Sequence, residues 1–412
     1  MVSNFPFVPA VGTAGGNSFS NGVWTVTRGH SARRAPIPMR LERLLLAAAL
    51  MIPATAVRAA VITVSPGGSI AAAVAGASAN DIISVQPGTY TNDFPVVNVP
   101  LTIEAAGAPG SVTIDDTGFP NDQGIIENFS TLTVNNLVLK GAATSLGGGN
   151  NAGAIRDHGS TALTVTNSIL EDSQDGILTE DPTRNEVVTI NNDQFLNNGA
   201  NNGSTHALYV GDAASLDVTN STFCGTRDGH DVKSKATTTT VSGSTMYIGA
   251  AGGGCGATNA GVGVDASFGG IVDLVNDAII QGSANSNGAL IIMGGESPLL
   301  TNNSLTITNT TLSGDGNGTG VSELDGNAAA SCIAPVAGSG NTVSGLTTDI
   351  KPAPCGALNA AVAVDEPSSL WLLLGALAGC CAFWRLRSLW TGMTPSMTLH
   401  SGDSRILGGQ RL

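Results

Sequence analysis

This chain of 412 residues is poor in aromatic and charged side chains, which make up 4% and 12% of it. Basic residues are especially scarce: residues 60–366 contain 7 Lys and Arg against 29 Asp and Glu, a net charge of −22 (7 − 29). Such an acidic surface argues against nucleic acid and anionic lipid as general partners. The shortage of aromatic residues, beside 54 Gly, fits a narrow core with many turns.

Several chemical signatures are also missing. The sequence has no nucleophile motif, no glycine-rich phosphate-binding loop and no metal-ligand spacing. Carboxylate pairs occur at 115–116 and 171–172, but adjacent residues of a strand face opposite sides, which does not suit a glycosidase. We therefore expect no cofactor and no resident metal. Ca²⁺ at the acidic turn 171–176 is the alternative, although this turn lacks the ligand spacing of a dedicated loop.

What the sequence does contain is a repeat. Each unit has apolar or β-branched residues at its first and third positions, Asn or Gly at its fifth and an apolar residue at its eighth. The units begin at Leu132, Leu163, Val188, Leu216, Thr239, Val272 and Leu305. Successive starts are 31, 25, 28, 23, 33 and 33 residues apart, by subtraction of these numbers. The alternation is typical of strands and the period is typical of a solenoid.

A single unit cannot bury its apolar face, so the units are expected to stack and build a continuous core. Asn or Gly at the fifth position favours a left-handed turn, and an Asn amide can also bond to the next rung. We predict an all-β fold, a right-handed parallel β-helix solenoid over residues 60–356. Roughly eight to ten rungs at ~4.8 Å each would make a rod of ~40–50 Å.

Upstream of the repeats, residues 68–76 have the composition of a short apolar helix that Ser69 can cap. Such a helix would seal the open end of the stack, which otherwise exposes core and strand edges. Residues 81–90 then read Asp-x-Ile-x-Val-x-Pro-Gly-Thr-Tyr. This phrase and the rungs after it resemble pectate-lyase-like β-helix proteins over about residues 61–350. The resemblance implies the fold and leaves the activity open.

An apolar segment near the start indicates export. Residues 39–59 have a basic beginning, an apolar stretch and small residues before a cleavage point after Ala59, as in a secretory signal peptide. Because this signal begins late, residues 1–38 are interpreted as a mis-assigned or disordered extension, with translation starting at Met39. A buried apolar helix is the alternative, but nothing amphipathic surrounds the segment.

A second apolar segment, residues 370–384, is expected to form a C-terminal transmembrane helix. Residues 357–369 before it are a linker that ends in a sorting motif. Residues 385–412 form a basic tail that is expected to stay cytoplasmic. An ordinary membrane anchor is one interpretation of this arrangement.

The other interpretation is a sorting signal. Glu366-Pro367-Ser-Ser, the apolar helix and the Arg residues after it resemble the PEP-CTERM signal of Gram-negative bacteria. The resemblance implies processing by an exosortase-type enzyme, with the membrane as a transient partner and release at the cell surface or outside the cell. Two departures are Asp365, where that family has Pro, and the 25 residues after Arg387.

The exported domain would contain four cysteines, Cys224, Cys255, Cys332 and Cys355. In an oxidising compartment these thiols can pair. The pairs 224–255 and 332–355 would each join residues about one rung apart. Three pairings are possible, and the spacing does not choose among them.

One stretch gathers residues of chemical interest. An offset of 24 residues places His206 beside His230 and Tyr209 beside Lys233 on adjacent rungs. The phrases His-x-Leu-Tyr-Val-Gly and Gly-His-x-x-Lys-Ser-Lys-Ala resemble a motif of a bacterial subgroup of right-handed β-helix proteins. That subgroup usually has Arg at the position of Lys235. The resemblance implies that these residues matter, without naming a reaction.

Strand alternation predicts two directions for these side chains. The interior group, on the side of Leu208 and Val232, is His206 and His230, and the outward group is Tyr209, Asp231, Lys233 and Lys235. For the histidines, a buried pair bonded to backbone is one interpretation and a catalytic role is the other. For the basic cluster, the alternatives are a surface patch paired with Asp228 and Asp231 or a ligand site.

The outward group suits an acidic polysaccharide. Lys233 or Arg227 can neutralise a uronate carboxylate, with Asp228 and Asp231 as further substrate contacts. Tyr209 or a deprotonated lysine can take the C5 proton in a β-elimination.

We therefore expect an exported protein that acts on or binds extracellular acidic polysaccharide or cell-surface glycan, and leave open whether it is an enzyme. The alternative is a non-catalytic structural or adhesive surface rod. A groove floored by the sheet and walled by loops would favour the first, and a flat face the second.

Overall fold

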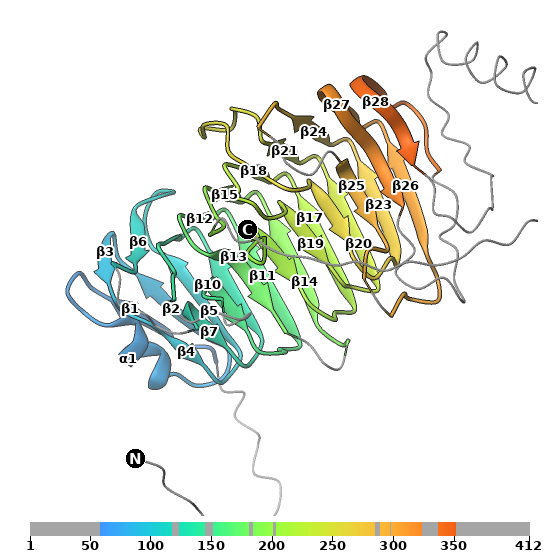
Figure 1. Ribbon diagram of the computed structural model, residues 1–412. Coiled ribbons are helices and arrows are strands. Elements are labelled where there is room, and N and C mark those ends of the chain that lie inside the picture. Colours follow the sequence, from blue (N-terminus) through green and yellow to red (C-terminus); the bar gives the residue numbers. More distant parts are fainter. Residues whose placement is uncertain are drawn as a thin grey trace, which may run out of the picture. The chain divides into compact units, whose positions relative to one another are not determined.

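A computed structural model describes residues 58–117, 123–144, 151–180, 184–200, 203–284, 289–296, 298–323 and 337–351. In this part of the chain the strands are short and parallel, and they stack along a rod with α1 (Ile70–Ala75) at its N-terminal end (Figure 1). Each rung contributes one strand to each of three ladders. Parallel sheets with almost no helix match the right-handed β-helix predicted from the repeat.

The first ladder is a ten-stranded sheet. Its strands, in order, are β1 (Val61–Val64), β2 (Asp81–Val85), β5 (Leu101–Ala105), β8 (Leu132–Asn135), β11 (Ala162–Thr166), β14 (Val187–Asn191), β17 (Ser215–Thr219), β20 (Thr238–Ser242), β23 (Ile271–Val275) and β26 (Ser304–Thr308). At ~4.8 Å between neighbours, ten strands extend over ~43 Å, which agrees with the predicted rod.

The second and third ladders form the other two sides. The second contains β3 (Gly88–Thr91), β6 (Val112–Asp115), β9 (Val138–Lys140), β12 (Ile169–Glu171), β15 (Gln194–Leu196), β18 (Thr222–Cys224), β21 (Thr245–Ile248) and β24 (Ala278–Gln281). The third contains β4 (Val96–Val97), β7 (Gly124–Asn128), β10 (Gly153–Asp157), β13 (Asp175–Thr179), β16 (Leu208–Val210), β19 (Val232–Ser234), β22 (Val264–Ala266) and β25 (Ala289–Met293). The long β27 (Thr311–Glu323) pairs with both β24 and β25 and so joins the two ladders, and β28 (Thr342–Lys351) pairs with β27.

The register confirms the repeat. The first residues of all seven units lie opposite one another on the first ladder, from Leu132 through Leu163, Val188, Leu216, Thr239 and Val272 to Leu305. The apolar eighth positions stack on the second ladder, where the rings of Phe195 and Phe223 lie 4.6 Å apart and nearly parallel. The fully buried rows build one core along the rod.

The turn after each first-ladder strand also has the predicted conformation. Its fifth-position residue is left-handed in every unit, with φ between +51° and +64°, at Asn136, Asn167, Asn192, Asn220, Gly243, Asn276 and Asn309. Asn tolerates this region better than most residues because its short polar side chain bonds locally. The Asn192 amide donates to Oδ1 of Asn167 at 2.8 Å, so the side chains bond from rung to rung.

The N-terminal cap is present where the sequence predicts it. Ser69 caps α1 by accepting a hydrogen bond from the backbone N–H of Ala72 at 3.0 Å. Asp93 accepts two further bonds from the N–H groups of Ile70 and Ala71, so the first turn of the helix is satisfied. Ile70 and Val74 turn into the rod and cover the first rung.

Several predicted segments lie outside the described residues: 1–38, 357–369, 370–384, 385–412 and nearly all of 39–59. The same applies to Glu366 and Pro367 of the sorting motif and to Cys332 and Cys355. Within the described ranges, no helix is both long enough and apolar enough to cross a bilayer.

Candidate functional site

Tyr209 and Lys233 are direct neighbours on the third ladder. Leu208 pairs with Val232 and Tyr209 with Lys233, in the register that the 24-residue offset predicts. Leu208 and Val232 are fully buried in the core, so the next residue of each strand, Tyr209 and Lys233, projects from the outer side of the ladder. Lys235 follows β19 by one residue and lies on the same side.

These residues line an open pocket of about 770 Å³. Its floor is the outer side of β13, β16 and β19, and its walls come from loops before, between and after these strands. The lining includes Leu178, His206, Tyr209, Lys233 and Lys235 from the floor and Asn151, Glu180, Arg184, Ser204, Asp212, Phe268 and Pro298 from the walls. This is the groove that favours a ligand site over a flat structural face.

The two lysines converge on one carboxylate. Nζ of Lys233 lies 2.6 Å from Oε1 of Glu296, and Nζ of Lys235 lies 2.7 Å from Oε2 of the same side chain. Burial by itself lowers the pKa of Lys235, but its hydrogen bonds to Glu296 and Tyr209 outweigh this and leave the pKa raised. A deprotonated Lys235 is therefore disfavoured as the proton acceptor.

Aromatic rings flank the ammonium groups. Nζ of Lys235 lies 4.7 Å from the ring centre of Phe268 and 5.5 Å from that of Tyr209. The guanidinium of Arg184 lies 5.7 Å from the Phe268 ring and forms an ion pair with Asp212 at 3.0 Å. These contacts stabilise cations that are partly removed from water.

His206 lies beneath the phenol of Tyr209. It is 4% exposed, its ring centre is 5.6 Å from that of Tyr209, and its Nδ1 accepts the backbone N–H of His230 at 3.1 Å. Burial, together with the neighbouring His230, Lys233 and Lys235, holds the pKa of His206 well below its ordinary value. His206 is thus neutral with its proton on Nε2, which makes it a hydrogen-bond donor rather than a base.

The directions predicted for three of these residues are wrong. His206 is buried, has its ring centre 5.0 Å from that of His230 and is bonded to backbone, as the buried-pair interpretation expected. The side differs from the prediction, because His206 lines the pocket with Tyr209, and Nδ1 of His230 is 3.0 Å from Oδ2 of Asp265. Asp231, expected to point outward, is fully buried and accepts a hydrogen bond from Thr226 at 2.5 Å. The reason is local, because β16 and β19 begin only at Leu208 and Val232 and alternation does not extend to the corner before them.

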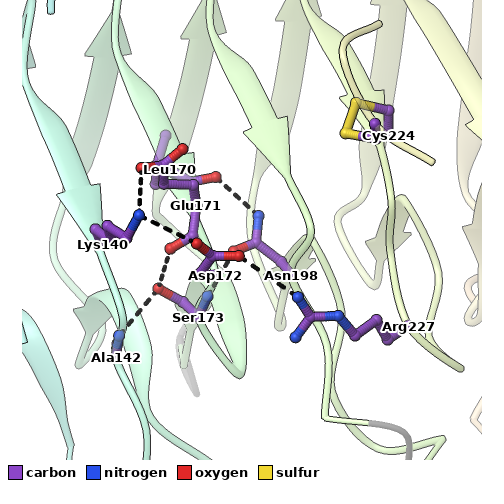
Figure 2. Close-up of polar contacts among 10 residues, drawn as sticks. Lys140, Ala142, Leu170, Glu171, Asp172, Ser173, Asn198, Cys224 and Arg227 are labelled. Carbon is purple, nitrogen blue, oxygen red and sulfur yellow. Dashed lines mark hydrogen bonds and ion pairs between the residues drawn. A yellow bond between two sulfur atoms is a disulfide. The ribbon is translucent and has the colours of Figure 1, made fainter. Parts of the chain in front are cut away.

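Arg227 and Asp228 are not among the residues that line the pocket. Arg227 instead reaches the side of the second ladder, where its Nη2 lies 3.4 Å from Oδ1 of Asp172 (Figure 2). Lys140 bridges Asp172 and Glu171 in the same network, at 3.3 and 3.2 Å. The acidic turn considered for Ca²⁺ is therefore occupied by ion pairs. Within the described residues, no group of three or more His, Cys, Asp or Glu side chains could hold a metal ion.

The Cys224–Cys255 pair is a disulfide, with its Cα atoms 5.7 Å apart. It joins the end of β18 to the loop between β21 and β22, one rung further along (Figure 2 shows Cys224 above Arg227). This is one of the pairings that the spacing allowed.

Four residues of the site escaped sequence reasoning: Arg184, Asp212, Phe268 and Glu296. Each comes from a loop outside the aligned strands, and Lys233 and Glu296 are 63 residues apart in sequence. One signal was available, because Arg184 is among the 7 basic residues of 60–366. Its left-handed backbone, at φ +56°, is unusual for a long side chain and marks a constrained position.

No protein-family model and no curated protein matches this sequence. Among solved structures, a PL6-family alginate lyase is similar at 15% identity and a TM-score of 0.42, over 69% of this chain and 39% of that one. A rice weevil pectin methyl esterase is similar at 16% identity and a TM-score of 0.33, over 70% of this chain and 90% of that one. The A-module of the Azotobacter vinelandii mannuronan C-5 epimerase AlgE4 is similar at 12% identity and a TM-score of 0.35, over 68% of this chain and 90% of that one. The chain spans 39% of the length of the alginate lyase. With TM-scores this low, we base neither fold nor activity on these likenesses.

Proposed function

We propose that this chain binds an acidic polysaccharide in the pocket of the third ladder. One observation carries the proposal: Arg184, Lys233 and Lys235 line a single open pocket, although residues 60–366 have only 7 basic residues and a net charge of −22. Each of these cations is paired with Asp212 or Glu296 in this structure, and can serve as the counter-charge of an anionic group that replaces that carboxylate. The flanking rings of Tyr209 and Phe268 add apolar surface for the sugar.

The same pocket is equipped for β-elimination of a uronate. Lys233 and Lys235 would neutralise the carboxylate, which acidifies the adjacent C5–H, and the Tyr209 phenolate would take the C5 proton. The C–H electron pair would form the C4–C5 double bond as the C4–O bond breaks, and the leaving oxygen would be protonated from the phenol or water. Lys235, which hydrogen-bonds Tyr209, would stabilise the phenolate. Neutral His206 would hold the phenol ring in place.

Binding is tested by titrating uronate tetrasaccharides, from pectate and from alginate, into the protein and into the double variant Lys233→Ala/Lys235→Ala. We expect the double variant to lose roughly a hundredfold in affinity, as for two charge-assisted contacts of ~1.5 kcal/mol each. Lys140→Ala/Arg227→Ala is the matched control, because it removes two positive charges beside the second ladder, outside the pocket, and should change nothing. Equal losses in both would show that only overall charge matters.

Catalysis is tested by following the ultraviolet absorbance of the unsaturated uronate product. Tyr209→Phe should retain binding and lose product formation. If the native protein binds but forms no product, the pocket is a binding site only. If it does not bind any uronate chain, the better account is a structural or adhesive rod.

We also propose that the protein is exported, with 39–59 as signal peptide and 366–384 as sorting signal and transient membrane helix. The Cys224–Cys255 disulfide supports this, because disulfides persist mainly in oxidising compartments. Cell fractionation with and without residues 39–59 tests the proposal, and protein that stays in the cytoplasm in both cases would refute it.

A further inference from the structure

We infer that Glu296 occupies the place of the ligand's own carboxylate, so that a uronate enters the pocket by exchanging with Glu296. This rests on the proposed function and specifies it, because it names the group that the two lysines recognise. It also makes Glu296 a residue that limits affinity rather than one that supports binding.

The first argument is the geometry of the ion pairs. Each oxygen of Glu296 takes one ammonium, Oε1 that of Lys233 at 2.6 Å and Oε2 that of Lys235 at 2.7 Å. The two lysines are two residues apart around β19, so they present their ammonium groups as a fork on one side of the ladder. The spacing of this fork therefore matches the two oxygens of a single carboxylate.

The second argument is electrostatic. The side chains of Lys233 and Lys235 are only 14% and 17% exposed, so both ammonium groups are largely removed from water and need a counter-charge. Asp265 is more distant, with Oδ2 3.8 Å from Nζ of Lys233. A ligand carboxylate that replaced Glu296 would restore both close ion pairs. Exchange thus conserves the charge of the site, whereas addition of a second carboxylate beside Glu296 would place like charges together.

The third argument is that Glu296 can leave. Its side chain is 37% exposed, more than either lysine, and it comes from the loop that follows β25. Its backbone N–H donates to the carbonyl of Ser267 at 2.8 Å, so the backbone is held in place. Rotation of the Glu296 side chain would then be enough to free the ammonium groups of Lys233 and Lys235. No rearrangement of the surrounding chain is required.

The exchange also orients the sugar. Both ammonium groups lie close to the Tyr209 ring, with Nζ 5.8 Å from its centre for Lys233 and 5.5 Å for Lys235. In a uronate the carboxylate is attached directly to C5. A carboxylate in the position of Glu296 therefore brings C5 next to the phenol, where the proposed elimination needs it.

The test is Glu296→Gln, measured by calorimetric titration of uronate tetrasaccharides at neutral pH. Removing the internal competitor should tighten binding roughly tenfold, which corresponds to ~1.4 kcal/mol. Glu296→Asp keeps the charge but shortens the reach, and should give an intermediate gain. A neutral tetrasaccharide should bind neither the native protein nor the variants.

Two controls separate competition from overall charge. Glu104→Gln and Asp273→Asn each remove one negative charge from the first ladder, away from the pocket; neither should reproduce the gain. Thermal unfolding verifies that each variant is folded. Unchanged or weaker binding by folded Glu296→Gln would overturn the inference, and would show that Glu296 holds the lysines in position. In that case the native protein still binds uronates and the proposed function stands; absence of binding by the native protein and the variant alike would refute both.

Discussion

Two of the regions in which the rod buries polar side chains differ from each other: the turns between the first and second ladders, and the corner beneath the pocket. Along the turns, each rung offers a side-chain oxygen to a backbone N–H of the rung before it. The series runs through Ser168, Asp193, Ser221, Ser244, Asp277, Thr310 and Asn341. In the corner, His206 is matched only by His230 on the next rung, and Oδ2 of Asp231 finds no hydrogen-bond partner among the described residues.

This difference distinguishes polar residues that stabilise the stack from polar residues that serve the pocket. A polar group that recurs on each rung satisfies the same backbone donor each time, so it belongs to the stacking itself. A buried polar group that occurs once costs desolvation without strengthening the repeat. Proteins tolerate this loss of stability mainly at functional sites. The unmatched polar groups of the corner lie directly beneath the pocket, which fits this rule.

The largest effect is expected in the repeating part. Phe195→Ala removes a fully buried ring stacked on Phe223 and should lower the free energy of unfolding by about 3–5 kcal/mol, measured by urea denaturation. Phe195→Leu copies Leu170, the residue opposite on β12, and should cost about 1 kcal/mol. Uronate binding by the folded variants should be unchanged. If these variants lost as much affinity as the lysine variants, the repeating core and the pocket would not be independent of each other.

A smaller, pH-dependent effect is expected at Asp193. Burial raises its pKa to about 7, although it accepts the N–H groups of Ser168 and Asn191. Because the folded-state pKa lies above the unfolded value of 3.8, folding favours the protonated form. Its contribution to stability is full below that value, declines as pH rises and is lost once pH passes about 7.

Asp193→Asn removes this decline. The variant should become increasingly more stable than the native protein as pH rises from about 4 to about 7, as measured by melting temperature. Asn is compatible with the position, because Asn341 accepts the N–H of Thr310 at the equivalent turn, at 3.0 Å. Asp273→Asn, on the outer side of β23, controls for net charge. A constant difference across this pH range would show that Asp193 is not protonated by burial.

The smallest effect is expected at a single turn. Asn220→Ala places an alanine in a left-handed conformation and should cost about 1–2 kcal/mol. Asn220→Gly should cost less, because Gly243 fulfils the same role one rung further along at φ +64°. If the two variants were equally unstable by denaturant titration, the amide bonds between rungs would matter more than the backbone conformation.

Sequence reasoning succeeded where the structure repeats. The seven units predicted the register of the first ladder, and the offset between the two histidine phrases predicted that Tyr209 pairs with Lys233. It failed at the corner, where His206, His230 and Asp231 precede their strands and alternation no longer applies. It also failed for Arg184 and Glu296. Both lie in loops, and loops do not follow the repeat, so their positions in space cannot be predicted from the spacing of the units.

The position of the disulfide in the stack affects how the rod resists tension. Hydrogen bonds between rungs run along the rod, so tension applied to its two ends would load the rung-to-rung junctions in series, and the weakest would open first. Cys224 and Cys255 join the rung of β17, β18 and β19 to the loop that leads into β22. Lys233 and Asp265 lie on the two sides of that junction. A rod under such tension would therefore open at another junction before β19 separated from β22.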